Sequence, residues 1–158
     1  MLPLRPARDD DSAAILALHA DVFAEYDGCV MVESEYPELA RPATSFAAMG
    51  GRFWVVEDEQ GLAATVAVTP EHEPGVYELR KLYVARRARR CGLGAHLVAE
   101  VERHVRAEGG TQVHLFSDTR FLDAHRLYAR LGYARLDGTR DLFDASHTVE
   151  YPFAKRLG

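Results

Sequence analysis

The feature that most constrains the fold of this chain is a basic turn that contains two glycines. The turn lies between an expected strand and an expected helix. The strand spans residues 76–84, the turn spans residues 86–95 (RRARRCGLGA), and the helix continues to Glu108. No acidic residue occurs between Glu78 and Glu100. Glycines let the backbone approach a ligand closely, and the free N–H groups at a helix N-terminus attract anions. The pattern therefore favours a phosphate-binding turn over the alternative, a solvated basic loop.

The overall composition limits the partners of such a turn. The formal net charge of the chain is -5, so a basic cluster indicates a local anion site more than a nucleic-acid surface. No apolar stretch approaches the roughly 20 residues that span a membrane, and the N-terminus lacks a signal-peptide segment. Cys29 and Cys91 lie far apart, which favours reduced thiols and no metal site. We expect one cytoplasmic domain over residues 1–158, with no nucleic-acid, membrane or metal partner.

The hydrophobic periodicity predicts the element order β-α-α-β-β-β-α-β-α-β-β. Helices are expected over about 13–26, 37–49, 95–108 and 121–131, and strands near 2–5, 53–57, 62–69, 76–84, 112–116, 133–136 and 148–153. On the third helix, an apolar stripe from Leu93 to Val105 should be buried, whereas Glu100, Glu102, Arg103 and Arg106 should face away. Hairpins followed by one parallel βαβ unit indicate a mixed α/β sheet, not a doubly wound Rossmann domain.

Two segments resemble the Gcn5-related N-acetyltransferase (GNAT) superfamily. Residues 89–94 (RRCGLG) fit its [Q/R]-x-x-G-x-[G/A] pattern, and residues 124–133 (AHRLYARLGY) are similar to its A-x-x-L-Y-x-x-L-G-[F/Y] segment. The resemblance implies a GNAT-type fold with splayed strands and acetyl-CoA as acyl donor. It also implies direct transfer of the acetyl group to a primary amine in a ternary complex.

The resemblance further implies which residues hold the donor. The backbone of the strand end, at Leu82, Tyr83 and Val84, would pair with the pantetheine arm like an added strand. A bulge in this strand would open the slot for that arm, and the sequence does not reveal whether it is present. The pyrophosphate would be held at the turn by Arg89, Arg90, Cys91, Gly92, Leu93, Gly94 and Ala95.

Two residues are candidates for proton transfer. Tyr128 stands where the family often has its general acid, although its spacing alone favours a core aromatic residue on an apolar helix face. Glu78 is the candidate base, directly or through water, and strand alternation places it on the same face as Arg80, Leu82 and Val84. The alternative for Glu78 is a solvated or ion-paired carboxylate.

The N-terminal quarter of the chain is expected to cover the acceptor. Residues 1–40 hold nine acidic residues against two arginines, and this excess would attract a small cationic amine. Tyr26, Glu33 and Arg80 are the candidate acceptor-binding residues, and Asp27, Glu33, Glu35 and Glu38 form an expected acidic wall. Ordinary solubility charge is the alternative explanation. A non-catalytic acyl-CoA-binding sensor, a protein N-terminal or lysine acetyltransferase, and a homodimer also remain open.

Overall fold

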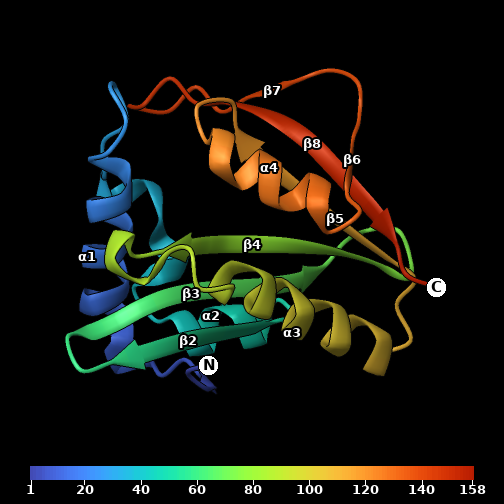
Figure 1. The fold of residues 1–158 in the computed structure, drawn as a ribbon, viewed down its shortest axis with the longest axis horizontal. Coiled ribbons are helices and arrows are strands. Elements are labelled where there is room, and N and C mark those ends of the chain that lie inside the picture. The colour runs from blue at the N-terminus through green and yellow to red at the C-terminus, as the bar shows by residue number, and fades with distance from the viewer.

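The computed structural model describes residues 1–158 as an eight-stranded sheet with helices on both faces (Figure 1). The strands follow the order β1-β2-β3-β4-β5-β8-β6, with β7 paired to β8, and only β4 and β5 run parallel. The mixed α/β fold predicted from the sequence is therefore confirmed. The strands are β1 (Leu4–Pro6), β2 (Arg52–Asp58), β3 (Gly61–Pro70), β4 (Val76–Val84), β5 (Gln112–Asp118), β6 (Ala134–Arg135), β7 (Arg140–Asp141) and β8 (Val149–Arg156).

Helices α1 (Ser12–Phe23) and α2 (Pro42–Ala48) pack on one face of the sheet, and α3 (Leu93–Ala107) packs on the other. Helix α4 (Leu122–Arg130) follows β5. The helix expected over 37–49 is shorter, because two 3-10 turns precede α2 and a proline begins it. Strand β7 was not predicted, because its two residues carry no periodicity. No helix combines the length and apolar character needed to cross a membrane.

The larger core lies between the sheet and α3. The predicted apolar stripe of α3 is fully buried there, from Leu93 to Val105. Glu102 is also buried, so the prediction that it faces away is wrong. Its carboxylate accepts hydrogen bonds from the Tyr133 hydroxyl at 2.9 Å and from the Lys155 ammonium at 3.0 Å. Sequence spacing could not reveal these partners, which offset the desolvation of the buried charge.

A bulge in β4 separates this strand from β5. Thr65 of β3 lies opposite Tyr83 while Ala67 lies opposite Arg80, so β4 carries one extra residue, and Lys81 has a φ of 58°. Pairing of β4 with β5 ends at Glu78, and beyond it the two strands diverge (Figure 1). Such bulges bend a strand and change the direction of its side chains.

The bulge also reverses the side-chain alternation along β4. Leu82 and Val84 pack with Leu79 in the core that contains α3, whereas the Arg80 guanidinium lies over the Phe46 ring on the opposite face. The expectation that Glu78 and Arg80 share a face with Leu82 and Val84 is therefore wrong. The extra residue shifts the period-two pattern by one.

A buried chain of hydrogen bonds holds this bulge in place. The Thr65 hydroxyl donates to the carbonyl of Lys81 at 2.7 Å, and it lies 2.9 Å from Nε2 of His19. Because the single hydroxyl proton goes to the carbonyl, His19 must donate from Nε2. Burial lowers the pKa of His19 to about 3, which keeps the imidazole neutral in this role. Residues of α1, β3 and β4 are thus linked at the point where the sheet opens.

Candidate functional site

A cavity of about 520 Å³ occupies the opening between β4 and α4. Nine of the ten residues predicted to hold the donor line it, and they are Leu82, Tyr83, Val84, Arg89, Arg90, Gly92, Leu93, Gly94 and Ala95. The tenth, Cys91, does not line the cavity. Its thiol instead contacts the carbonyl oxygen of Ala88 at 3.0 Å, within the turn. The sequence motif and the cavity therefore coincide, while the binding role of each residue stays a prediction.

The backbone of the turn offers this cavity a run of free donors. The N–H groups of the six residues from Arg90 to Ala95 make no hydrogen bond within the chain, and His96 is the first to donate, to Gly92. Arg90 and Gly92 have φ values of 64° and 81°, so the turn uses a left-handed conformation twice before α3 begins. Unpaired N–H groups at a helix start, with the helix dipole behind them, form an anion site.

The arginines of the turn contribute less free charge than their number suggests. Arg89 binds the Glu25 carboxylate through both terminal nitrogens at 2.6 and 2.8 Å, and its Nε donates to the Val84 carbonyl at 3.1 Å. Arg87 is paired with Asp58 at 2.9 Å. These contacts fix the turn against the segment that follows α1, the end of β4 and the β2–β3 hairpin. The exposed Arg90 makes no ion pair and lines the cavity.

Gly94 has a packing role that the motif alone does not show. A Cβ built on Gly94 would lie 2.9 Å from Cδ2 of Leu127 on α4. Leu127 also lines the cavity, so the missing side chain lets α4 approach the start of α3 and close one wall. The second glycine therefore sets the width of the cavity.

The open edge of β4 presents further backbone groups. Ala85 donates its N–H to the Ala63 carbonyl at 2.7 Å, toward β3. Backbone groups alternate between the two sides of a strand, so those of Leu82 and Val84 point to the side that β5 has left, where the Val84 carbonyl also accepts the Arg89 hydrogen bond. An extended ligand could pair with this edge as an added strand.

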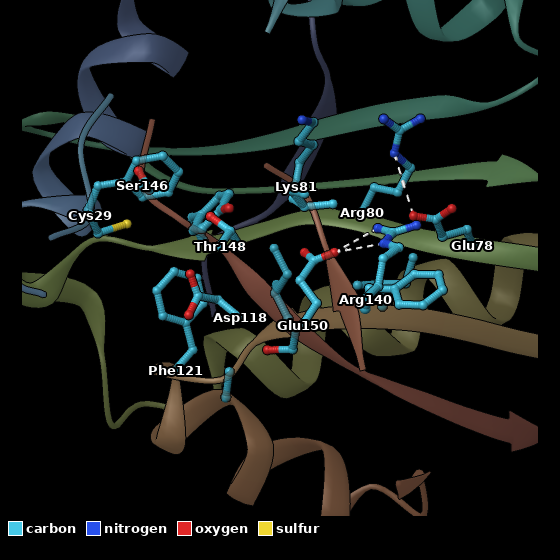
Figure 2. A pocket seen from close by; sticks show the side chains of 18 of the residues that line it. Cys29, Glu78, Arg80, Lys81, Asp118, Phe121, Arg140, Ser146, Thr148 and Glu150 are labelled. Carbon is cyan, nitrogen blue, oxygen red and sulfur yellow. Dashed lines mark hydrogen bonds and ion pairs between the residues drawn. The ribbon is translucent and has the colours of Figure 1, made fainter. Parts of the chain in front are cut away.

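A second cavity, of about 220 Å³, lies on the other side of the opening, and Figure 2 shows its lining side chains. Both cavities are lined by Leu82, Tyr83, Phe121 and Ala124, so they meet at these residues. Three acidic and three basic side chains line the smaller cavity, and they are Glu78, Asp118, Glu150, Arg80, Lys81 and Arg140. Acidic and basic side chains are thus equal in number in this cavity.

Tyr128 lines the smaller cavity from α4. Its ring packs against Tyr133 and Phe153 with centroids 5.9 and 5.6 Å apart, so it is also the core aromatic residue that its spacing indicates. Its hydroxyl makes no hydrogen bond to another side chain or to the backbone. Burial raises the pKa of this hydroxyl, which keeps it protonated at neutral pH. The smaller cavity therefore contains a protonated hydroxyl, while the general-acid role of Tyr128 stays a prediction.

Glu78 is the last residue of β4 that pairs with β5, and it lines the same cavity. Its carboxylate lies 3.8 Å from Nε of Arg80, which is beyond hydrogen-bond distance. Burial raises the pKa of the Glu78 carboxyl, and the nearby charges of Arg80 and Arg140 partly oppose that shift. A carboxylate with a raised pKa and a loose partner is suited to accept a proton.

The three candidate acceptor-binding residues fall in different places. Arg80 lines the smaller cavity, Tyr26 lines the larger one and packs on Phe121 at 4.7 Å between centroids, and Glu33 is exposed and lines neither. The other members of the expected acidic wall, Asp27, Glu35 and Glu38, also line neither cavity. The expected acidic wall is therefore not part of the lining, because Glu35 accepts from the Ala145 N–H and Glu38 pairs with Lys81.

Sequence reasoning missed the contribution of the C-terminal third. Asp118 and Glu150 lie opposite each other on β5 and β8, and Arg140 lies opposite Glu150 on β7. The loop before β8 also meets the segment after α1, because Ser146 exchanges hydrogen bonds with the Val30 backbone at 2.9 and 3.0 Å. The pairing of β8 with both β5 and β7 brings these residues to the cavity, and no motif in the sequence marks that pairing.

No group of three or more His, Cys, Asp or Glu side chains is arranged to hold a metal ion. Both cysteines are free thiols, with Cys29 buried beside the smaller cavity and Cys91 exposed.

Comparison with known proteins shows which family and which solved structures this chain is similar to. Residues 15–133 match the model of the Acetyltransferase (GNAT) family. An uncharacterized N-acetyltransferase of Schizosaccharomyces pombe is 35% identical over 97 residues, which cover 61% of this chain and 60% of that protein. The aminoglycoside N(6')-acetyltransferase type 1 of Serratia marcescens is 37% identical over 59 residues, which cover 37% of this chain and 40% of that protein. The chain thus spans at most about three fifths of these curated relatives.

Solved structures share the fold along the whole chain. A GNAT-family acetyltransferase of Staphylococcus aureus superposes with a TM-score of 0.85 at 14% identity, and both chains are fully covered. The yncA protein of Salmonella typhimurium, solved with its cofactor acetyl-CoA, has a TM-score of 0.75 at 16% identity over 100% of this chain and 95% of that chain.

Proposed function

The chain belongs to the acetyltransferase (GNAT) family, and from this premise we propose that it is an acetyl-CoA-dependent N-acetyltransferase acting on a small primary amine. One observation carries the proposal: two cavities meet at Leu82 and Tyr83, and the larger one ends at six unpaired N–H groups. A donor with a pyrophosphate at one end and an acyl group at the other fits the larger cavity. An acceptor in the smaller cavity would then face that acyl group in a ternary complex.

The residues of the larger cavity suit acetyl-CoA. The N–H groups from Arg90 to Ala95 would bind its pyrophosphate, and the Arg90 guanidinium would add a charge contact. The open β4 edge at Leu82 and Val84 would pair with its pantetheine arm. When bound, acetyl-CoA supplies an acetyl thioester where the cavities meet.

Two side chains of the smaller cavity would move protons. The amine nitrogen must lose a proton as it forms a bond to the acetyl carbon, and Glu78 would accept that proton directly or through water. The carbon–sulfur bond breaks, and Tyr128 would give its proton to the departing thiolate. The raised pKa of the Tyr128 hydroxyl keeps it protonated at neutral pH, so the proton is present when the thiolate departs.

The shape of the smaller cavity favours a small acceptor over a protein. Its volume of about 220 Å³ is below the range of roughly 300–1,000 Å³ that is usual for small-molecule pockets. The hydrogen bonds between Val30 and Ser146 close one wall, so an extended peptide has less room there. The amine itself is cationic in solution, and the carboxylates that would attract it are Glu78, Asp118 and Glu150 rather than the expected acidic wall.

Calorimetry on Gly92→Glu tests the donor site. The new carboxylate would lie among the free N–H groups and repel a pyrophosphate, so acetyl-CoA binding should be lost. Gly109→Glu is the matched control, because Gly109 has a φ of 79° at the opposite end of α3 and lines neither cavity. Both variants carry the same backbone strain, but only the control should keep its affinity. Equal affinity in the two folded variants would exclude this donor site.

A screen of small amines, with release of free CoA and product mass as readouts, tests the transfer itself. Acetylation of a small amine supports the proposed function. Binding of acetyl-CoA without turnover on any amine would instead indicate a non-catalytic sensor.

A further inference from the structure

The charged side chains that line the smaller cavity are not equally well paired. Six charged side chains line this cavity, and four of them have an oppositely charged partner at hydrogen-bond distance. The exception is the pair of Arg80 and Glu78, whose closest approach is 3.8 Å. The close pairs are Lys81 with Glu38 at 2.7 Å, Arg140 with Glu150 at 2.7 Å and Arg120 with Asp118 at 2.8 Å.

Arg80 is held in place without a strong hydrogen-bond acceptor. Its guanidinium lies over the Phe46 ring at 5.3 Å, and one terminal nitrogen lies 3.7 Å from the sulfur of Met49, which is a weak acceptor. The side chain is only 26% exposed, so water satisfies its donors incompletely. A fixed, partly buried guanidinium with open donors matches the geometry of a carboxylate or a comparable acid group.

Arg140 adds positive charge at the same end of the cavity. Figure 2 shows Arg80, Glu78 and Arg140 together, away from Cys29, Asp118 and Phe121 at the other end. The charges of both arginines act on the Glu78 carboxyl. Arg140 gives Nε and one terminal nitrogen to Glu150, at 3.1 and 2.7 Å, and its other terminal nitrogen has no partner.

We propose that the acceptor is an amino-acid-type molecule, whose acid group is bound by Arg80 and whose amine faces the carboxylates of the same cavity. The inference rests on the proposed function and narrows its substrate class. A molecule that carries both an acid group and an ammonium group can contact Arg80 with the first and Glu78 with the second. These contacts would be shorter than the one between Arg80 and Glu78, and every charged side chain that lines the cavity would then have a partner. A purely cationic amine would compete with Arg80 and Arg140 for Glu78, and it would leave the Arg80 donors open.

Paired acceptors test this inference. Each L-amino acid of a panel is compared with its amide and its decarboxylated amine, with CoA release measured under saturating acetyl-CoA. The wild-type kcat/KM should be about 10- to 100-fold higher for the best acid than for its two partners, as expected for a hydrogen bond to a charged group. Amides or amines that are used as well as their acids would overturn the inference while the proposed function survives.

Variants assign the preference to Arg80. Arg80→Met keeps a long apolar arm over Phe46 and should remove most of the preference for the acid, while Arg80→Lys should keep part of it. Arg52→Met is the control, because Arg52 is exposed and lines neither cavity. Equal losses for acid and amide in a folded Arg80→Met protein would contradict the assignment. If acetyl-CoA binds but no member of the panel is acetylated, this inference fails, whereas the proposed function is decided by the wider screen of small amines.

Discussion

Replacing Thr65 by valine should destabilise the opening of the sheet far more than its size suggests. Thr65 is fully buried, and its hydroxyl joins the His19 ring to the carbonyl of Lys81 at the bulge. Valine has the same shape without the hydroxyl, so Thr65→Val creates no cavity. It leaves one donor on His19 and one acceptor on Lys81 without partners inside the protein.

The cost follows from those two groups. An unsatisfied buried donor or acceptor costs roughly 1–3 kcal/mol, so Thr65→Val should lower the free energy of unfolding by about 2–6 kcal/mol. Thr65→Ser keeps the hydroxyl and removes one methyl group, which should cost only about 1 kcal/mol. Because Lys81 carries the left-handed backbone of the bulge, relaxation there should also weaken acetyl-CoA binding along the β4 edge.

Chemical denaturation of the two variants and of Thr69→Val measures this difference. Thr69 is also a buried threonine on β3, but its hydroxyl makes no hydrogen bond within the chain, so its replacement by valine should be nearly neutral. Calorimetry with acetyl-CoA provides the second readout. Similar losses of stability in Thr65→Val and Thr69→Val would refute the reasoning, because the hydrogen-bond chain would then contribute nothing.

Two further predictions concern proton transfer. Tyr128→Phe should lower kcat, measured by CoA release, by about 10²-fold with little change in acetyl-CoA affinity. Tyr133→Phe is the control and should leave kcat unchanged, because the Tyr133 hydroxyl binds Glu102 and Tyr133 lines neither cavity. Glu78 accepts a proton only when ionised, so kcat/KM should fall as the pH drops through a pKa that burial places above the usual 4.5. Glu78→Gln should slow the reaction and remove this acidic limb, and a limb that persists would assign it to another group.

The parts of the molecule with local patterns could be predicted from the sequence. The apolar stripe of α3 and the glycine turn before it follow from local spacing, and both occur in the structure. The start of α3 lies two residues before the predicted Ala95, because Gly92 adopts a left-handed φ and the helix begins immediately after it. Boundaries depend on such single dihedral angles, which spacing does not determine.

The features that depend on contacts between distant segments could not be predicted. The extra residue at Lys81 has no signature within β4, and it reverses which side chains share a face with Glu78. The smaller cavity takes Asp118 and Glu150 from strands whose pairing is set only in the folded sheet. Any role predicted from alternation alone fails where a bulge intervenes.

Charge is the property for which composition misleads most in this protein. Residues 86–90 contain four arginines, yet Arg87 and Arg89 bind Asp58 and Glu25, so half of this charge shapes the turn instead of facing a ligand. Two carboxylates of the expected acidic wall, Glu35 and Glu38, are likewise engaged in contacts elsewhere, and three acidic and three basic side chains line the smaller cavity. The groups of the turn that can bind an anion are mainly its free backbone N–H groups. A count of charged residues does not include these groups. For the same reason, our proposal for the acceptor rests on the one loosely paired arginine that lines the smaller cavity, Arg80, and not on the net charge of the surrounding segment.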